Sequence, residues 1–353
     1  MGRQRVAPGV EHLRLRRRVP PQQVHVAHIS GVARTRLRTV LAGSALSGPG
    51  AAAAPTTALC ARSRCAVAVN GDFADPAGRP VGAAVSAGEL VTTPGPDPSV
   101  TQLNLDAEGR PSIGDLSWSV ALQAGDHRLA VDAVNRPPGD GVTLYSSRWG
   151  GTTGTDAATV ELVVGLPGAG EAALPPGATT VRLLGLRAGG STPIVPRTVV
   201  AAARGVAAAE LVGLWVGALT AAGGVATLHV STGGAVESVG GSPRLLPSGP
   251  FERAGPEAAP FVLERHPRTM VGITAVGEVL LVAVDGRRPG RSDGVPLAEA
   301  ASILAELGAT EGINLDGGGS TTFVVRGRLA NRPSEPPGER PVPSALVVLP
   351  VGR

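Results

Sequence analysis

The chain has 353 residues, among them 50 Gly and 32 Pro. These two residue types fill more than a fifth of the chain, roughly twice their ordinary share of ~12%. Because 42% of the residues are hydrophobic and no collagen-like period occurs, the composition excludes a triple helix and a disordered chain. It predicts many turns and short strands, few long helices, and a core built mostly from Val, Leu and Ala.

The basic charge is carried by arginine alone, since the sequence contains no lysine. Nine arginines lie in residues 1–40 against one acidic residue, Glu11, and residues 1–20 are expected to form a basic arm that could touch nucleic acid or anionic lipid. The aromatic stacking groups and zinc ligands of common nucleic-acid modules are missing, so nucleic acid is not an expected partner. Without lysine, a Walker-type phosphate loop and Schiff-base chemistry are excluded.

The two cysteines, Cys60 and Cys65, have no zinc-like spacing with further Cys or His residues. Either they form a local disulfide in an exported protein or they are two inert thiols. No export signal is visible, because the first 30 residues hold no apolar core of a signal peptide. Residues 211–230 lack formal charge like a membrane span, but Gly223-Gly224 favours two buried strands around a turn, so no transmembrane helix is expected.

Short strands dominate the predicted order of elements. Strands are expected at 24–29, 65–73 and 83–91, in a hairpin over 109–122, at 159–165 and 181–186, and at 312–316 and 321–325. Helices are expected at 296–309, after Pro296 and before a Gly308 cap, and within the Ala-rich stretch 198–214. This order predicts an α+β fold with mainly antiparallel, turn-rich sheets, a few short helices, and its chemistry near the C-terminal end.

Three polar clusters each follow an apolar run: His266–Thr269, Asp285–Arg288 and Asn314–Ser320. Rigid strands commonly present site residues on loops in this way. Asp316 precedes three glycines, whose unobstructed backbone amides could bind an anion. A plain turn, in which the aspartate accepts local backbone hydrogen bonds, is the alternative for each cluster.

These clusters carry a resemblance to a known family. HPRT at 266, VDGR at 284, NLDGGGST at 314 and NRPSEPPGERPV at 331 together resemble the phosphodiester glycosidases, whose animal member is a lysosomal enzyme that removes N-acetylglucosamine from phosphate on mannose. APGV at 7, AVAVNGDF at 66 and VGGSPRLL at 239 add to the resemblance. It implies a phosphodiester glycosidase-like catalytic domain over 21–353, with a variable β-rich middle at about 90–195.

The resemblance also implies the site. Arg268 and Arg287 would grip a phosphate, Asp316 would face the sugar carbon, and Asp285 would orient or activate water. The expected catalytic residues are Asp285, Asp316 and Arg268, and the expected substrate-binding residues are Asn70, Thr269, Arg287, Gly317, Gly318, Ser320, Asn331 and Arg340.

No metal site is assigned by the motifs, and a divalent cation remains a possible cofactor. Asp72 and Asp75 could bind a hard cation or form a solvated turn. His25 and His28, three residues apart on a predicted strand, should point to opposite faces rather than form a metal pair. Trp118, Tyr145 and Trp149 are the side chains expected to stack on a sugar ring.

The predicted function is therefore a hydrolase that cleaves a sugar from a sugar-phosphodiester, with a sugar-phosphodiester or glycan as its substrate. The glycan would belong to the cell envelope or lie outside the cell, and the protein would be extracellular or in the cell envelope. The alternative is a non-catalytic carbohydrate or cell-wall binding module that retains the fold.

Overall fold

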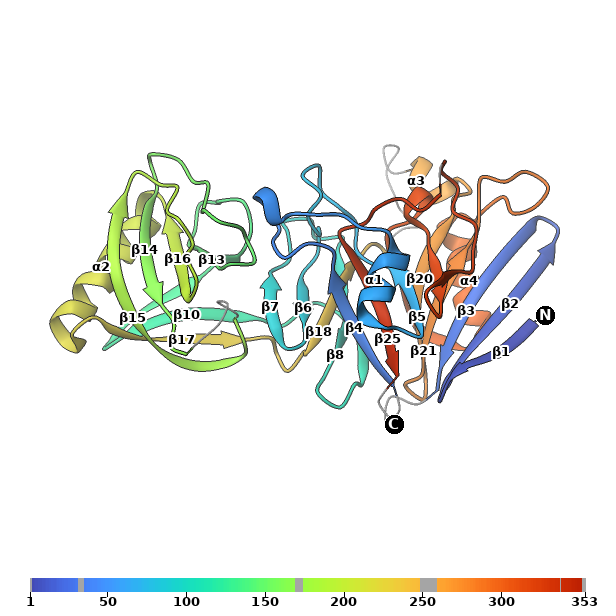
Figure 1. Cartoon of the computed structure of the whole chain (residues 1–353), viewed down its shortest axis with the longest axis horizontal. Coiled ribbons are helices and arrows are strands. Elements are labelled where there is room, and N and C mark those ends of the chain that lie inside the picture. The colour runs from blue at the N-terminus through green and yellow to red at the C-terminus, as the bar shows by residue number, and fades with distance from the viewer. Residues whose placement is uncertain (1, 31–34, 169–173, 248–258, 337, 351–353) are drawn as a thin grey trace.

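The structure is a computed structural model of the chain and describes residues 2–30, 35–168, 174–247, 259–336 and 338–350. Four mostly antiparallel sheets and a few short helices make up an elongated molecule (Figure 1). The predicted α+β class is confirmed. The helices in the described ranges are α1 (Thr56–Ser63), α2 (Gly205–Ala222), α3 (Ala259–Leu263) and α4 (Leu297–Glu306).

A seven-stranded sheet contains both the first and many of the last strands of the chain. One of its faces is covered by α4, which buries Leu297, Ala300 and Leu304 at helical spacing. The helix predicted at 296–309 is thus confirmed, with Pro296 at its N-cap and Gly308 at a φ of 92° just beyond its end. In spatial order the strands are β1 (Gly2–Ala7), β2 (Val10–Arg18), β3 (Pro21–Ile29), β21 (Val279–Val284), β20 (Arg268–Thr274), β22 (Ala309–Asn314) and β19 (Arg244–Leu246).

The arginine-rich start of the chain lies in this sheet rather than in an arm separate from it. Residues 2–18 form β1 and β2, and β2 pairs along its whole length with β3. Val10 and His12 are buried on one face of β2, while Leu13 and Leu15 pack against the α4 side. These side chains anchor the strand, and the arginines alternate with them.

The other face of the seven-stranded sheet packs on a five-stranded sheet. Its core includes Ile29, Val67, Leu281, Phe323 and Leu346, all fully buried. The strand order is β24 (Arg328–Leu329), β23 (Phe323–Val325), β5 (Val67–Asn70), β25 (Ser344–Pro350) and β4 (Thr35–Leu41). A second five-stranded sheet continues the molecule, with β7 (Glu89–Thr92), β6 (Ala84–Ser86), β18 (Glu237–Gly241), β8 (Thr101–Leu105) and β9 (Pro111–Gly114).

Helix α1 lies on the five-stranded sheet that contains β5, β23 and β25, and it carries the disulfide. Cys60, in the helix, is bonded to Cys65 just beyond it, with their Cα atoms 5.0 Å apart. The sequence left open whether these cysteines form a local disulfide or are two inert thiols, and the structure has the disulfide.

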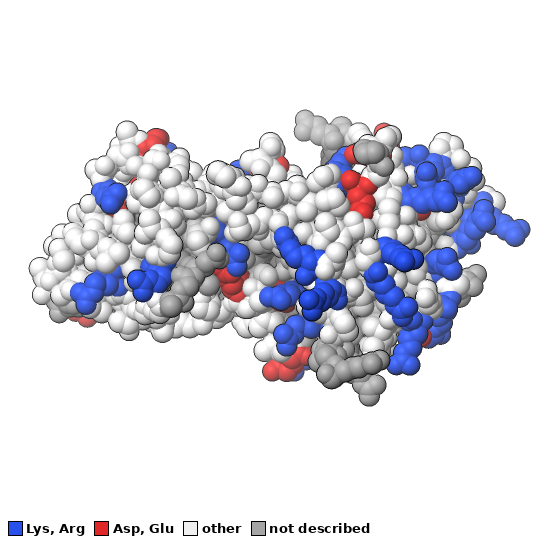
Figure 2. Space-filling view, in the orientation of Figure 1, with Lys and Arg blue, Asp and Glu red and all other residues white. Residues whose placement is uncertain are grey.

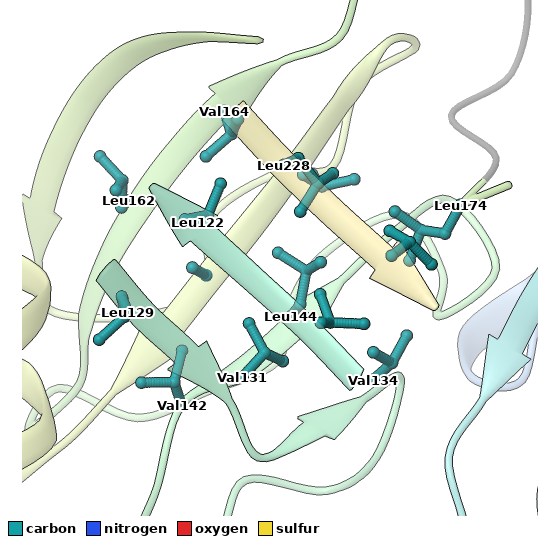
Figure 3. Close-up of a cluster of buried hydrophobic side chains, with 14 of the residues drawn as sticks. Leu122, Leu129, Val131, Val134, Val142, Leu144, Leu162, Val164, Leu174 and Leu228 are labelled. Atoms are coloured by element: carbon teal, nitrogen blue, oxygen red, sulfur yellow. The ribbon is translucent and has the colours of Figure 1, made fainter. Parts of the chain in front are cut away.

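An eight-stranded sheet wraps around α2 at the opposite end of the molecule (Figure 1). Figure 3 shows its core, in which Leu122, Leu144, Leu162 and Leu228 point toward one another from different strands. In order its strands are β11 (His127–Val131), β10 (Ser119–Ala124), β17 (Val225–Ser231), β15 (Gly177–Ala188), β14 (Val160–Gly165), β16 (Thr198–Ala203), β13 (Thr143–Tyr145) and β12 (Ala133–Val134).

Two predictions in this region are wrong and a third is correct only in part. Of the helix expected within 198–214, the part from Gly205 onward is the start of α2. The part before it is the strand β16, because all six of its residues are buried between β13 and β14. The first part of 211–230 is helical rather than a strand, since Leu211, Leu214 and Ala218 form one buried stripe of α2. The expected hairpin over 109–122 is divided, because β9 and β10 belong to different sheets.

The glycine turn within 211–230 is present, with Gly223 and Gly224 both at positive φ between α2 and β17. Among the described residues, no helix is both long and apolar enough to cross a membrane.

Two buried histidines make the stability of the seven-stranded sheet depend on pH. His12 Nε2 and His25 Nδ1 lie 3.1 Å apart, and both rings contact Phe323. His28 points the other way and pairs with Glu278, as the strand spacing predicts. Burial, then the neighbouring His12 and Arg14, lower the pKa of His25 to about 4 from 6.5. Neutral His25 therefore loses its favourable effect on folding as the pH falls from about 6.5 toward 4.

Replacing His25 by Asn removes this titration. We expect the stability advantage of the wild type over H25N to shrink between pH 7 and pH 4 by on the order of 3 kcal/mol. Denaturant titrations across this range measure the difference, in which carboxyl titrations shared by both proteins cancel. His229→Asn, on β17 of the eight-stranded sheet, is the control. A stability difference between the wild type and H25N that does not change with pH would contradict the expectation.

Candidate active site

One cleft collects six of the residues expected from the sequence motifs. It has a volume of about 380 Å³ and lies where the loops before β20 and after β22 meet. A hollow of about 450 Å³ beside Glu237 is larger, but none of the expected residues lines it. The cleft is lined by Phe73, Pro260, Phe261, Glu264, His266, Arg268, Arg287, Asp316, Gly317, Gly318, Gly319 and Arg340.

Asp316 and Glu264 are the carboxylates that line this cleft, and Asp316 is the less exposed of the two. It follows the buried end of β22, and its Oδ1 accepts a hydrogen bond of 2.9 Å from the amide of Gly317. Burial raises its pKa, while hydrogen bonds from Ser320 and Gly317 and the charge of Arg340 act in the opposite direction. Burial thus favours the protonated form of Asp316, whereas the hydrogen bonds and the nearby cation favour the carboxylate.

The glycine loop brings other groups close to Asp316 rather than offering an open row of amides. Gly317 donates to Asp316, Gly318 donates to the Pro267 carbonyl over 2.8 Å, and the Ser320 amide donates to Gly317. The loop itself therefore uses the amides of Gly317 and Gly318, whereas the amide of Gly319, which lines the cleft, has no hydrogen-bond partner among the described residues. A side chain at Gly319 would collide with Glu335 and Arg340, so this glycine permits their close approach.

Arg340 and Arg287 form a cationic wall with Glu335 between them. Arg340 binds both carboxylate oxygens of Glu335, and Arg287 Nη1 lies 3.8 Å from Oε1 of the same residue. Both guanidinium groups are a little under half exposed. Arg340 Nη1 also reaches Ser320 Oγ over 3.4 Å. The wall is therefore open to a ligand while Glu335 holds the two cations together.

Glu335 was missed by the sequence reasoning. It stands in the SEPPGERPV stretch, where two other acidic and basic residues share the same motif and nothing distinguishes its role. The signal that identifies it is spatial, because its partners Arg287 and Arg340 lie 48 and five positions away in the chain.

Arg268 lines the cleft, but most of its guanidinium N–H groups donate to backbone carbonyls of the protein. Its Nε donates to the Val295 carbonyl over 3.1 Å, its Nη2 donates to the Phe261 carbonyl, and its guanidinium lies over the Phe261 ring. Burial lowers its pKa to about 10, so it stays charged near neutral pH. No acceptor among the described residues bonds to Nη1, and this donor is available to a ligand.

Asp285 and Asn331 do not line the cleft. Asp285 is 2% exposed, and its Oδ1 accepts hydrogen bonds of 3.1 Å from Asn331 Nδ2 and from the Arg332 amide. Asn331 also binds the Phe323 amide and the Thr321 carbonyl. Burial raises the pKa of Asp285. The pair therefore fixes the loop after β24.

Asn70 and Thr269 are buried beneath the cleft. Asn70 Oδ1 accepts from Thr269 Oγ1 at 2.7 Å and from the Thr322 amide at 3.1 Å, and its Nδ2 donates to the Asp316 carbonyl at 2.6 Å. Both side chains have no exposed surface. They position Asp316 and are not among the residues that line the cleft.

Asp72 and Asp75, which the sequence suggests together as a cation site, have different surroundings in the structure. Asp72 is buried, its Oδ2 accepts from the Gly82 amide at 2.7 Å, and its Oδ1 has no partner among the described residues. Burial raises its pKa to about 7, and the charge of Asp316 adds to this rise. Asp75 instead closes its own turn through the Ala77 and Arg79 amides and the Arg79 side chain.

A cation site on Asp72 and Asp75 is therefore not built. Within the described ranges, no group of three or more His, Cys, Asp or Glu side chains is arranged to hold a metal ion.

The aromatic side chains expected to stack on a sugar are elsewhere. Tyr145 and Trp149 are buried against each other, and Trp118 packs on the core of the eight-stranded sheet. Phe73 and Phe261 line the cleft instead, with their ring centroids 6.1 Å apart. The sequence alone did not reveal this pair, because Phe73 and Phe261 lie far apart in the chain and no motif connects them.

Comparison with known proteins identifies the relationship of this site. A family model described as phosphodiester glycosidase matches residues 191–349. Over 75 residues, 21% of the chain, the sequence is 46% identical to N-acetylglucosamine-1-phosphodiester alpha-N-acetylglucosaminidase of Bos taurus, and the same protein of Homo sapiens is 43% identical over 75 residues. The chain is related to the phosphodiester glycosidases. The matched segment spans 14% of the bovine protein's length.

Solved structures extend the relationship to the fold. A hypothetical protein from Synechocystis superposes with a TM-score of 0.70 at 22% identity, covering 97% of this chain and 62% of that one. A Burkholderia pseudomallei K96243 protein predicted to be exported gives a TM-score of 0.68 at 28% identity, covering 94% of this chain and 74% of that one. The zebrafish N-acetylglucosamine-1-phosphodiester alpha-N-acetylglucosaminidase catalytic domain, auto-inhibited by its pro-peptide, gives 0.51 at 16% identity, covering 97% and 82%.

The region matched by the phosphodiester glycosidase model contains Arg268, Arg287, Asp316 and Arg340 but not Asn70. The N-terminal strands therefore contribute Asn70 from outside the matched region to the same site.

The buried hydrogen bonds of Asn70 should make it a large contributor to stability. Asn70→Ala leaves the Asp316 carbonyl, the Thr322 amide and the Thr269 hydroxyl unpaired, and we expect a loss of about 3 kcal/mol. Thr269→Val removes only one of these bonds and should cost about 1 kcal/mol. Denaturant unfolding measures both variants, and equal losses would contradict the assignment of Asn70 as the shared partner.

Proposed function

We propose that the chain is a hydrolase that cleaves a sugar from a sugar-phosphodiester. One observation carries the proposal: the partly buried carboxylate of Asp316 lies in the same cleft as three arginine side chains. A phosphodiester is an anion whose two non-bridging oxygens share the negative charge, and a planar guanidinium group can bind both of them. The relation to the phosphodiester glycosidases supports the same substrate class.

In this proposal the arginines hold the leaving group. Arg287 and Arg340 present partly exposed guanidinium groups, and Arg268 presents its Nη1. A phosphodiester oxygen needs little protonation to leave, so fixed positive charge that stabilises it as the bond to the sugar carbon breaks is the main requirement. Glu335 keeps Arg287 and Arg340 together before the substrate binds.

Asp316 serves the sugar side. As a carboxylate it stabilises the oxocarbenium-like carbon and takes the proton of the incoming water, so that the hydroxyl joins the carbon and the bonding pair leaves with the phosphate oxygen. The role of orienting water, expected of Asp285, does not fit its bonds to Asn331 and Arg332. We assign Asp285 to holding the loop.

We propose further that the protein acts outside the cytosol, in the cell envelope or beyond it. A Cys60–Cys65 disulfide is typical of oxidising compartments. The similar Burkholderia protein is predicted to be exported.

Two variants separate the two halves of the mechanism. Asp316→Asn should lower kcat by ~10²-fold or more on both a sugar-phosphodiester and an aryl glycoside, because it removes the group on the carbon side. Arg287→Gln should lower kcat/KM by ~10-fold or more on the phosphodiester and much less on the aryl glycoside, since only the former offers a phosphate. Steady-state hydrolysis of both substrates measures this.

Arg110→Gln, on an exposed turn between β8 and β9, is the matched control and should leave both activities unchanged. Equal slowing of both substrates by Arg287→Gln would show that this arginine does not bind phosphate. Binding of the sugar without hydrolysis by the wild type would favour the non-catalytic carbohydrate-binding module.

A further inference from the structure

The seven-stranded sheet carries a row of unpaired arginines beside the cleft. Arg14, Arg16 and Arg18 alternate along β2 and are all exposed. No carboxylate or other acceptor among the described residues bonds to their side chains, whereas Arg17, on the opposite face, pairs with Glu306 of α4. Alternate residues on a strand lie about 6.6–6.8 Å apart, so the three guanidinium groups form a regular line of positive charge.

Figure 2 shows that basic side chains gather over the lobe formed by the seven-stranded sheet, while the other lobe is mostly uncharged. Within residues 2–30 and 35–40, Glu11 is the single acidic residue, and Arg3 binds it. The positive charge of the row is therefore not neutralised by its own strands.

The register of the sheet connects this row to the active-site loops. Arg16 lies opposite Gln23 on β3, and the Gln23 carbonyl accepts the amide of Asp285, which follows β21. Opposite residues in antiparallel strands share a face, and neighbouring strands lie about 4.8 Å apart, so Arg16 is about 10 Å from Asp285 along the sheet.

Further arginines occupy the space between the row and the cleft. Arg288 and Arg332 lie close enough to Asp285 for their charges to act on it, and Arg288 Nη1 is buried without a partner among the described residues. Arg287, the next residue along, lines the cleft. Positive charge thus continues from β2 to the site of the proposed reaction.

We propose that this arginine row binds a polymer with repeated phosphodiester groups and leads one of its units into the cleft. The inference rests on the proposed function and specifies its substrate class as polymeric. A chain of phosphates matches a line of regularly spaced cations, and each neutralised phosphate releases counterions.

The surface fits nucleic acids and membranes less well. Residues 2–30 and 35–72 include no aromatic side chain on which a base could stack. Among the described residues of β1, β2 and β3 and their turns, Val19 is the one large apolar side chain that is highly exposed, whereas interfacial membrane binding uses a broad apolar face.

The test replaces Arg14, Arg16 and Arg18 by Gln in one variant of the full chain. Long-chain inorganic polyphosphate is the binding probe, measured at several salt concentrations. We expect the variant to bind at least ~10-fold more weakly than the wild type, with a salt slope smaller by about 2 to 3. Arg110, Arg128 and Arg187, all exposed and outside this sheet, are replaced together as a control with the same change in net charge.

Unchanged polyphosphate binding by the Arg14/Arg16/Arg18 variant would overturn the proposal. So would tighter binding of the wild type to single-stranded DNA or to anionic phospholipid vesicles than to polyphosphate at equal phosphate concentration. Because this probe is bound and not hydrolysed, the result is independent of the proposed reaction.

A second readout concerns turnover. The variant should keep its kcat/KM on a small sugar-phosphodiester and lose ~10-fold on a polymer of sugar-phosphodiester units, because only the polymer reaches from the cleft to β2. Equal activity of wild type and variant on the polymer would contradict the guiding role. Absence of hydrolysis in both proteins would reject the proposed function while leaving the polyphosphate result to decide the binding surface.

Discussion

The site depends on one buried amide, the side chain of Asn70. Its three hydrogen bonds connect β5 to β20 through Thr269, to the start of β23 through Thr322, and to the backbone of Asp316. These groups come from chain positions up to 252 residues apart. In a buried environment each unpaired polar group is costly, so the amide stabilises the packing of the four segments against one another. The orientation of Asp316 follows from this packing.

The charged side chains of the cleft around Asn70 differ in how deeply they are buried. Arg268 is enclosed and binds protein carbonyls, whereas Arg287 and Arg340 remain partly exposed and share Glu335. Asp316 is buried enough for its pKa to rise, and the negative charge of Glu335 acts in the same direction. The arrangement suits an anionic ligand, because three arginines line the cleft against the two carboxylates of Asp316 and Glu264.

The sequence predicted the parts of this arrangement that are local. The amphipathic stripe of α4 and the strand-then-turn pattern before Asp316 are set by residues close in the chain, and both are present. The motif residues in the cleft also followed from the resemblance. The helix α2 was misjudged because Ala and Gly fit strand and helix patterns almost equally, and burial against the eight-stranded sheet decides between them.

What the sequence could not supply is contact between distant segments. Glu335 joins Arg287 and Arg340, and Phe261 rather than Tyr145 or Trp149 reaches the cleft. Asp285 follows a strand in the same way as Asp316, yet it faces Asn331 and the Arg332 amide. The register of β3 and β21 and the path of the loop after β24 give these two aspartates their different surroundings.

The central claim is that water attacks the sugar carbon and not the phosphorus. Hydrolysis of a sugar-phosphodiester in water enriched in oxygen-18 tests it directly, with the products followed by mass spectrometry and by the phosphorus NMR isotope shift. The account predicts that the label enters the released sugar and that the phosphate monoester carries none. Label in the phosphate would show cleavage of the phosphorus–oxygen bond and would contradict the assignment of Asp316 and the arginines to a glycosidase.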